Sequence, residues 1–111
     1  MSDAYDLVRE AILNKKIIVA TYDLFERKLC PHALGTKNGK KMGLFYQIEG
    51  GSASTTRLLL HGSHHNWRCL QISRMTDVQI IDGEWETALG RDRQKTCIDT
   101  VDVEIPWLAS D

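Results

Sequence analysis

The chain has 111 residues, a formal net charge of −1 and an ordinary hydrophobic fraction of 42%. This composition predicts one globular domain and excludes a disordered chain. No stretch approaches the roughly 18 consecutive apolar residues of a membrane helix, and the first residues lack the basic and apolar regions of a signal peptide. Three widely spaced cysteines, Cys30, Cys69 and Cys97, favour reduced thiols in a cytoplasmic protein over a disulfide framework.

The charges are distributed unevenly. Residues 1–75 carry eleven Lys and Arg against six Asp and Glu, a net of +5, whereas residues 76–111 carry three against nine, a net of −6. Binding along a duplex needs a strong basic stripe, which the whole chain does not supply, but a single phosphate or a short strand end needs only a few arginines. We expect the acidic part to be solvated surface or to fold over the basic part.

The first elements are a helix and two strands. Apolar residues at helical spacing, with acidic residues in the first turn, predict an amphipathic helix over residues 3–14. The β-branched run at 17–22 predicts a strand, a turn follows, and 26–30 alternates as a second strand. Pro31 ends this strand or places it at an edge, because proline cannot donate to a ladder.

The rest of the chain reads as short strands. Asn38-Gly39 is a strong hairpin signal that joins residues 32–35 to a third strand. The further predictions are strands at 42–50, 57–62 and 67–72, a tight turn at 73–76, a last core strand at 77–81, a turn at Asp82-Gly83, a loop from 86 and an edge strand within 97–108. The expected fold is therefore mainly β with one N-terminal helix (α+β), a small, partly open barrel over residues 1–86, with residues 87–111 as an extension packed on it.

Four segments in this order resemble the WYL domain, more narrowly the compact stand-alone WYL-like proteins of bacteria. They are "AILNKKIIVATYD", "RKLCPHALG", "FYQIEGG" and "WRCLQISRMTDVQIID", which together cover roughly residues 4–86. Phe45 stands where the family has Trp, Tyr46 matches its Tyr, and Gln47 replaces its Leu. Arg68 and Arg74 fall where the family places basic residues of its ligand pocket, and Pro31 matches the proline after the second strand.

The resemblance implies an SH3-like (Sm-like) barrel that senses a nucleotide, a nucleic-acid fragment or a similar anionic ligand. We expect neither enzymatic activity nor a cofactor. Guanidinium groups suit bidentate recognition of phosphate or carboxylate, and they stack on bases. A Gly/Ser loop at 50–56 offers amides and hydroxyls to an anion. The alternative is that the arginines form surface ion pairs and that Tyr46 fills the core. The ligand-binding residues expected are Tyr46, Arg68, Arg74, His32, Gln47, Ser52, Ser54 and Trp67.

Other site types have weaker support. His61, His64, His65 and Cys69 have donor atoms that suit zinc, but the spacing is not a standard one and no CxxC accompanies it. Cys30 and His32 lie two residues apart, as ordinary packing on a strand face also requires, so no catalytic set is predicted. The alternative function is a protein-interaction or oligomerisation subunit that docks through strand edges or the acidic part.

Overall fold

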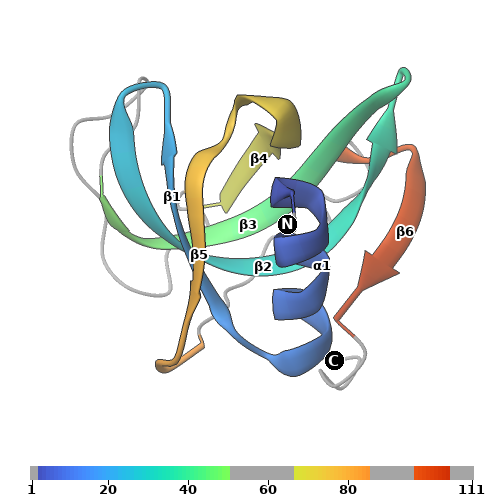
Figure 1. The fold of residues 1–111 in the computed structure, drawn as a ribbon. Helices are drawn as coiled ribbons and strands as arrows, with labels where there is room; N and C mark the ends of the chain where they lie inside the picture. The colour runs from blue at the N-terminus through green and yellow to red at the C-terminus, as the bar shows by residue number, and fades with distance from the viewer. Residues whose placement is uncertain (1–2, 51–66, 86–96, 106–111) are drawn as a thin grey trace.

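The structure is a computed structural model that describes residues 3–50, 67–85 and 97–105. It is mainly β with one N-terminal helix, as expected (Figure 1). The strands form an antiparallel sheet in the order β4-β3-β2-β1-β5, and β6 pairs with β2. Strands β4 and β5 end this path without pairing to each other, so the sheet is not closed. The elements are α1 (Ala4–Asn14), β1 (Ile17–Tyr22), β2 (Phe25–Lys37), β3 (Lys40–Gly50), β4 (Trp67–Gln71), the 3-10 helix η2 (Ile72–Arg74), β5 (Thr76–Ile81) and β6 (Thr100–Glu104).

Helix α1 covers the inner side of the bent sheet. The Asp3 side chain accepts a hydrogen bond from the Asp6 amide at 2.9 Å and caps the helix, because the first amides of a helix have no partner within it. Val8, Ala11 and Ile12 are fully buried in one cluster with side chains from β1 to β4. In Figure 1 the helix lies in front of β2, between β5 and β6. The helix and the first strand are confirmed.

Two tight turns build the central hairpins. Asn38 and Gly39 have φ values of 52° and 79° between the paired residues Lys37 and Lys40. Positive φ at both central positions matches the twist of a hairpin, so the predicted turn is confirmed. The turn between β1 and β2 has the same character without a glycine, since Asp23 and Leu24 have φ values of 49° and 71°.

The prediction that Pro31 ends or edges a strand is wrong. Strand β2 runs through Pro31 to Lys37, and it changes its partner on one side at this point. Its last pair with β1 is Leu29 with Ile18, and its first pair with β6 is Ala33 with Glu104. The missing N–H of proline therefore falls between two ladders, where it removes no hydrogen bond on that side.

Strand β5 is not a core strand, contrary to the prediction. It pairs only with β1, and its side chains are exposed or half-buried. The apolar residues Val78 and Ile80 pack partly against the core from this edge. The predicted strands at 67–72 and within 97–108 are confirmed as β4 and β6, with Ile72 belonging to η2. The predicted strand at 57–62 and the loop at 86–96 lie outside the described residues.

Acidic side chains of the second half pair with basic side chains of the first half. Asp102 on β6 lies 3.5 Å from Arg9 on α1, and Asp82 after β5 pairs with Lys16. These contacts agree with the expectation that the acidic part folds over the basic part. Within the described residues, no helix is long and apolar enough to span a membrane.

Tyr5 joins helix α1 to the C-terminal strand. Its hydroxyl donates to the Asp102 carboxylate, and the Lys41 ammonium lies 4.8 Å from its ring centre. Burial and the hydrogen bond to Asp102 raise the pKa of Tyr5 to about 12, while Arg9 opposes the shift. The neutral phenol is thus the form that the fold favours.

We predict that this contact stabilises the protein below pH 10 and is lost as the pH rises through 12. The folded pKa of Tyr5 lies above its usual value of 10.0, so the contribution is complete below that value and disappears above the folded pKa. Melting temperatures of the wild type and Tyr5→Phe, measured by circular dichroism from pH 8 to pH 12, should therefore converge as the pH increases. A difference that stays constant over this range would contradict the assignment.

Candidate functional site

The two faces of the sheet bury different sets of side chains. The inner face, which lies against α1, carries Ile18, Leu29, Phe45 and Leu70 in one cluster. The outer face carries a second cluster, which contains Cys30, Ala33, Leu44, Tyr46, Trp67 and Cys97. Since successive strand residues point to opposite faces, the register assigns each polar side chain to one of them.

Three polar side chains lie on the inner face and form what we call the arginine row: Arg27, Gln47 and Arg68. Arg27 on β2 pairs with Ala20, Gln47 on β3 pairs with Leu29, and Arg68 on β4 pairs with Phe45. The three residues therefore step diagonally across neighbouring strands.

The row is held together at its Arg68 end. Arg68 Nε donates to Gln47 Oε1 at 3.1 Å, and its terminal nitrogen donates to the Trp67 carbonyl oxygen at 3.0 Å. Gln47 is fully buried, whereas Arg68 is half-buried. Solvent thus reaches the row at Arg68, and the buried amide fixes the direction of that guanidinium.

Arg27 is a buried cation that has no counter-ion among the described residues. It is 3% exposed, and its one hydrogen bond in the described structure runs from a terminal nitrogen to the Tyr22 carbonyl oxygen at 3.0 Å. Its Nε has no hydrogen-bond partner, and no carboxylate pairs with it among the described residues. Burial lowers the pKa of Arg27, but a guanidinium stays protonated in proteins and cannot relieve the cost by losing its proton.

Aromatic rings partly replace the missing anion around Arg27. Its guanidinium carbon lies 5.1 Å from the centre of the Tyr22 ring and 6.0 Å from that of Phe25. The negative face of an aromatic ring attracts a cation, but by less than a carboxylate at contact distance. The positive charge at Arg27 is therefore only partly compensated.

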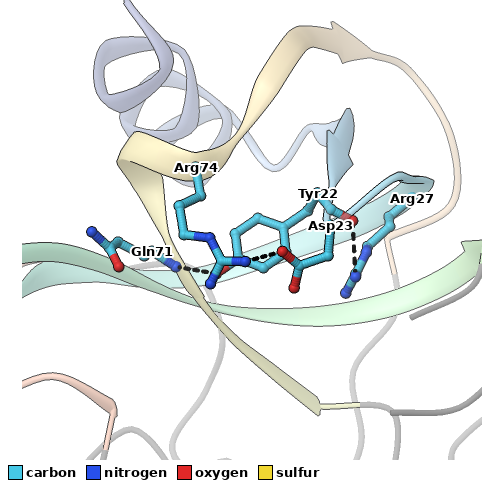
Figure 2. A network of polar contacts seen from close by, with 5 residues as sticks. All are labelled: Tyr22, Asp23, Arg27, Gln71 and Arg74. Carbon is cyan, nitrogen blue, oxygen red and sulfur yellow. Dashed lines mark hydrogen bonds and ion pairs between the residues drawn. The ribbon is translucent and has the colours of Figure 1, made fainter. Parts of the chain in front are cut away.

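Tyr22 lies between the arginine row and Arg74. The group that we call the Tyr22 cluster consists of Tyr22, Asp23, Arg27, Gln71 and Arg74 (Figure 2). The Arg74 guanidinium lies 4.8 Å from the Tyr22 ring centre and forms an ion pair with Asp23. The Tyr22 hydroxyl accepts a hydrogen bond from the backbone N–H of Gln71 at 3.2 Å. This bond joins the end of β4 to the end of β1, two strands that do not pair in the sheet.

The outer face carries an aromatic group. The His32 ring lies 4.5 Å from the Trp67 ring and 4.3 Å from the Trp85 ring, and Tyr46 meets Trp67 edge to face at 5.2 Å. His32 Nδ1 donates to the Cys30 carbonyl oxygen at 2.7 Å. Both His32 and Tyr46 are buried, so this group acts as core packing on that side of the sheet.

The structure divides the predicted ligand residues between the two faces. Arg68 and Gln47 are in contact with each other, whereas Arg74 contacts Tyr22 and Asp23. Tyr46, Trp67 and His32 belong to the outer face and do not share a face with the arginine row. Ser52 and Ser54, with the loop around them, lie outside the described residues.

Sequence reasoning missed Arg27, although a signal was present. In the strand that contains it, Leu29 is an inward residue, and alternation places Arg27 on the same face two positions earlier. An arginine at an inward position of a strand is unusual, since arginine is almost never fully buried unless it is paired. That conflict between pattern and residue type marks Arg27 as a candidate site residue.

The expectation of reduced thiols is wrong for two of the three cysteines. Cys69 on β4 and Cys97, which precedes β6, form a disulfide, although they lie 28 positions apart in the sequence. Sequence spacing did not reveal this pair, because the sheet brings their Cα atoms to 5.7 Å. The bonded Cys69 offers no thiolate to a metal, and His61, His64 and His65 lie outside the described residues. The described residues contain no group of three or more His, Cys, Asp or Glu suited to a metal ion.

Comparisons with known proteins found no matching family model, no similar curated protein and no similar solved structure. The arginine row and the Tyr22 cluster are therefore the features of the described residues from which a function can be inferred.

We predict that the disulfide stabilises the fold by about 3 kcal/mol, because it closes a long loop in the unfolded chain. Reduction, or the double substitution Cys69→Ser and Cys97→Ser, should lower the melting temperature by at least several degrees. Calorimetry with and without a reductant measures the change. In the double variant the reductant should have no further effect, which controls for Cys30. Alkylation of all three cysteines in the folded, unreduced protein would contradict the assignment.

Proposed function

We propose that this protein is a non-enzymatic ligand-sensing module of the WYL-like type, which binds a nucleotide, a nucleic-acid fragment or a similar anionic ligand at the arginine row. The proposed fold is an SH3-like barrel. The order of β1 to β5 in the sheet and the short helix η2 between β4 and β5 support it. The WYL-like assignment rests on the order of the four sequence segments.

The observation that carries the proposal is the only partly compensated charge of Arg27, which has no carboxylate partner among the described residues. A buried cation without a partner costs several kcal/mol relative to an apolar side chain of similar size. The described part of the chain supplies one carbonyl oxygen and two aromatic rings to this guanidinium, but no anion. A bound anion would satisfy the vacant Nε and neutralise the charge at the same time.

The neighbours of Arg27 suit such a ligand. Gln47 and Arg68 extend the row with an amide and a second guanidinium, and the half-buried Arg68 gives access from solvent. The paired N–H groups of a guanidinium match the spacing of phosphate oxygens. Tyr22 adds an aromatic ring close to the Arg27 guanidinium. The arrangement combines two features that suit anion binding: hydrogen-bond donors held in place and positive charge.

The location and the alternative function stay predictions. A cytoplasmic location was expected from reduced thiols, and the Cys69–Cys97 disulfide removes that ground, because such bonds persist mainly in oxidising compartments. A role as an interaction or oligomerisation subunit stays a separate hypothesis, with light scattering at several concentrations as its test.

We predict opposite effects of Arg27→Met on stability and on binding. In buffer without multivalent anions the variant should gain about 1–2 kcal/mol of unfolding free energy, because an apolar side chain replaces the unpaired charge. The wild type should be stabilised by roughly 2.7 kcal/mol at 100 times the dissociation constant of its ligand, and the variant should not respond. A thermal-shift screen with inorganic phosphate, mononucleotides, cyclic nucleotides and short single strands, at constant ionic strength, measures both effects.

Two further variants sharpen this test. Arg68→Gln should weaken the ligand response without the gain in stability, since Arg68 is half-buried and already bonded to Gln47. Lys40→Met removes a positive charge at the exposed turn between β2 and β3 and should behave as the wild type does. If Arg27→Met lowers the stability and keeps the full ligand response, the proposed site is wrong.

A further inference from the structure

In the Tyr22 cluster, two guanidinium groups lie near the Tyr22 ring, and the protein's own carboxylate at Asp23 pairs with one of them. Arg27 and Arg74 lie 5.1 and 4.8 Å from the centre of the same ring. Asp23 forms its ion pair with Arg74, whereas Arg27 has no carboxylate partner among the described residues. In Figure 2 the Arg74 side chain extends from η2 to Asp23, which lies between the Arg74 and Arg27 side chains in this view.

The position of Asp23 is fixed by the turn. Asp23 and Leu24 are its two central residues, and both have positive φ. Aspartate tolerates this conformation better than most residues do, and asparagine tolerates it equally well. Tyr22 lies directly before the turn and accepts two hydrogen bonds. The backbone N–H of Gln71 donates to its hydroxyl, and the Arg27 guanidinium donates to its carbonyl oxygen. The carboxylate of Asp23 is thus tethered next to Arg74 at a high effective concentration.

The charges of the cluster do not balance. Two guanidinium groups meet one carboxylate, and the carboxylate side chain is 29% exposed while that of Arg74 is 52% exposed. A solvent-accessible ion pair of this kind contributes little to stability, so its loss to a competing anion costs little. Arg74 can follow an incoming anion, because half of its long side chain lies in solvent.

From these contacts, and on the basis of the proposed function, we infer that Asp23 is a specificity-determining residue of the site. Its carboxylate occupies Arg74 in the absence of ligand, and a phosphate monoester that engages both Arg27 and Arg74 takes its place. A monoester has three terminal oxygens and close to two negative charges at neutral pH. A carboxylate or a phosphodiester has two such oxygens and a single charge, which Arg27 alone can satisfy.

The test is the affinity of adenosine 5′-monophosphate for the wild type, Asp23→Asn, Arg74→Gln and the double variant, measured by titration calorimetry. Asp23→Asn should tighten binding roughly tenfold, the change expected for one additional charge-assisted hydrogen bond. In the Arg74→Gln background the same substitution should have little effect, because the competing ion pair is already absent. The affinity for adenosine 3′,5′-cyclic monophosphate, a diester, should change little on Asp23→Asn in either background.

The control is Asp77→Asn, which changes an exposed aspartate that also has positive φ, at 52°, on strand β5. It should leave both affinities unchanged. An equal gain from Asp23→Asn with and without Arg74 would overturn the inference, since removal of negative charge alone would explain it. Binding that depends on Arg27 but does not change in Asp23→Asn would overturn this inference and leave the proposed function intact. Absence of binding in the wild type and every variant would overturn both.

Discussion

Strand β2 determines where the other elements of this protein lie. It pairs with β3 along its length, with β1 before Pro31 and with β6 after it. A strand with two successive partners on one side must bend between them, and a residue without an N–H is suited to that point. The sheet is therefore curved, and helix α1 covers its inner side.

The candidate site follows from the same strand. Because β2 pairs with β1 before the bend, Arg27 faces inward between Ala20 of β1 and the third strand. The first core cluster already fills the inner face with apolar side chains around Leu29 and Phe45. Arg27 therefore stands at the polar end of an apolar interior, where its charge has a low dielectric around it and a large effect on any anion that approaches.

Local signals in the sequence predicted much of the fold. The capped helix, the strand at 17–22 and the hairpin at Asn38-Gly39 each depend on a few neighbouring residues, and each was found at its predicted place. The errors arose where distant segments decide the outcome. The passage of β2 through Pro31 depends on β6, and the disulfide of Cys69 depends on a residue 28 positions away. No local pattern carries that information.

At the candidate site, too, local sequence identified residues but did not determine which face of the sheet they occupy. Arg68, Gln47 and Arg74 were named from the resemblance. The structure brings Arg68 and Gln47 into contact on the inner face, whereas Arg74 contacts Tyr22. Tyr46 was named for the same reason, but strand alternation sends it to the opposite face from Arg68. A motif gives residue identities in chain order, whereas a face is determined by register, and register depends on bulges such as the one between Lys28 and Leu29.

The partly compensated charge of Arg27 also bears on the stability of a small domain. With 111 residues, the stability of the fold is a small difference between large terms, and a buried cation lowers it. Stabilising replacements are available at this position, since Met or Leu would fill the same space without a charge. A residue that weakens the folded state yet lies among ordered donors is typical of sites where binding, and not packing, determines the side chain. The disulfide and the contact between Tyr5 and Asp102 hold β6 and the residues just before it against β4 and helix α1, and this stabilisation offsets part of that cost.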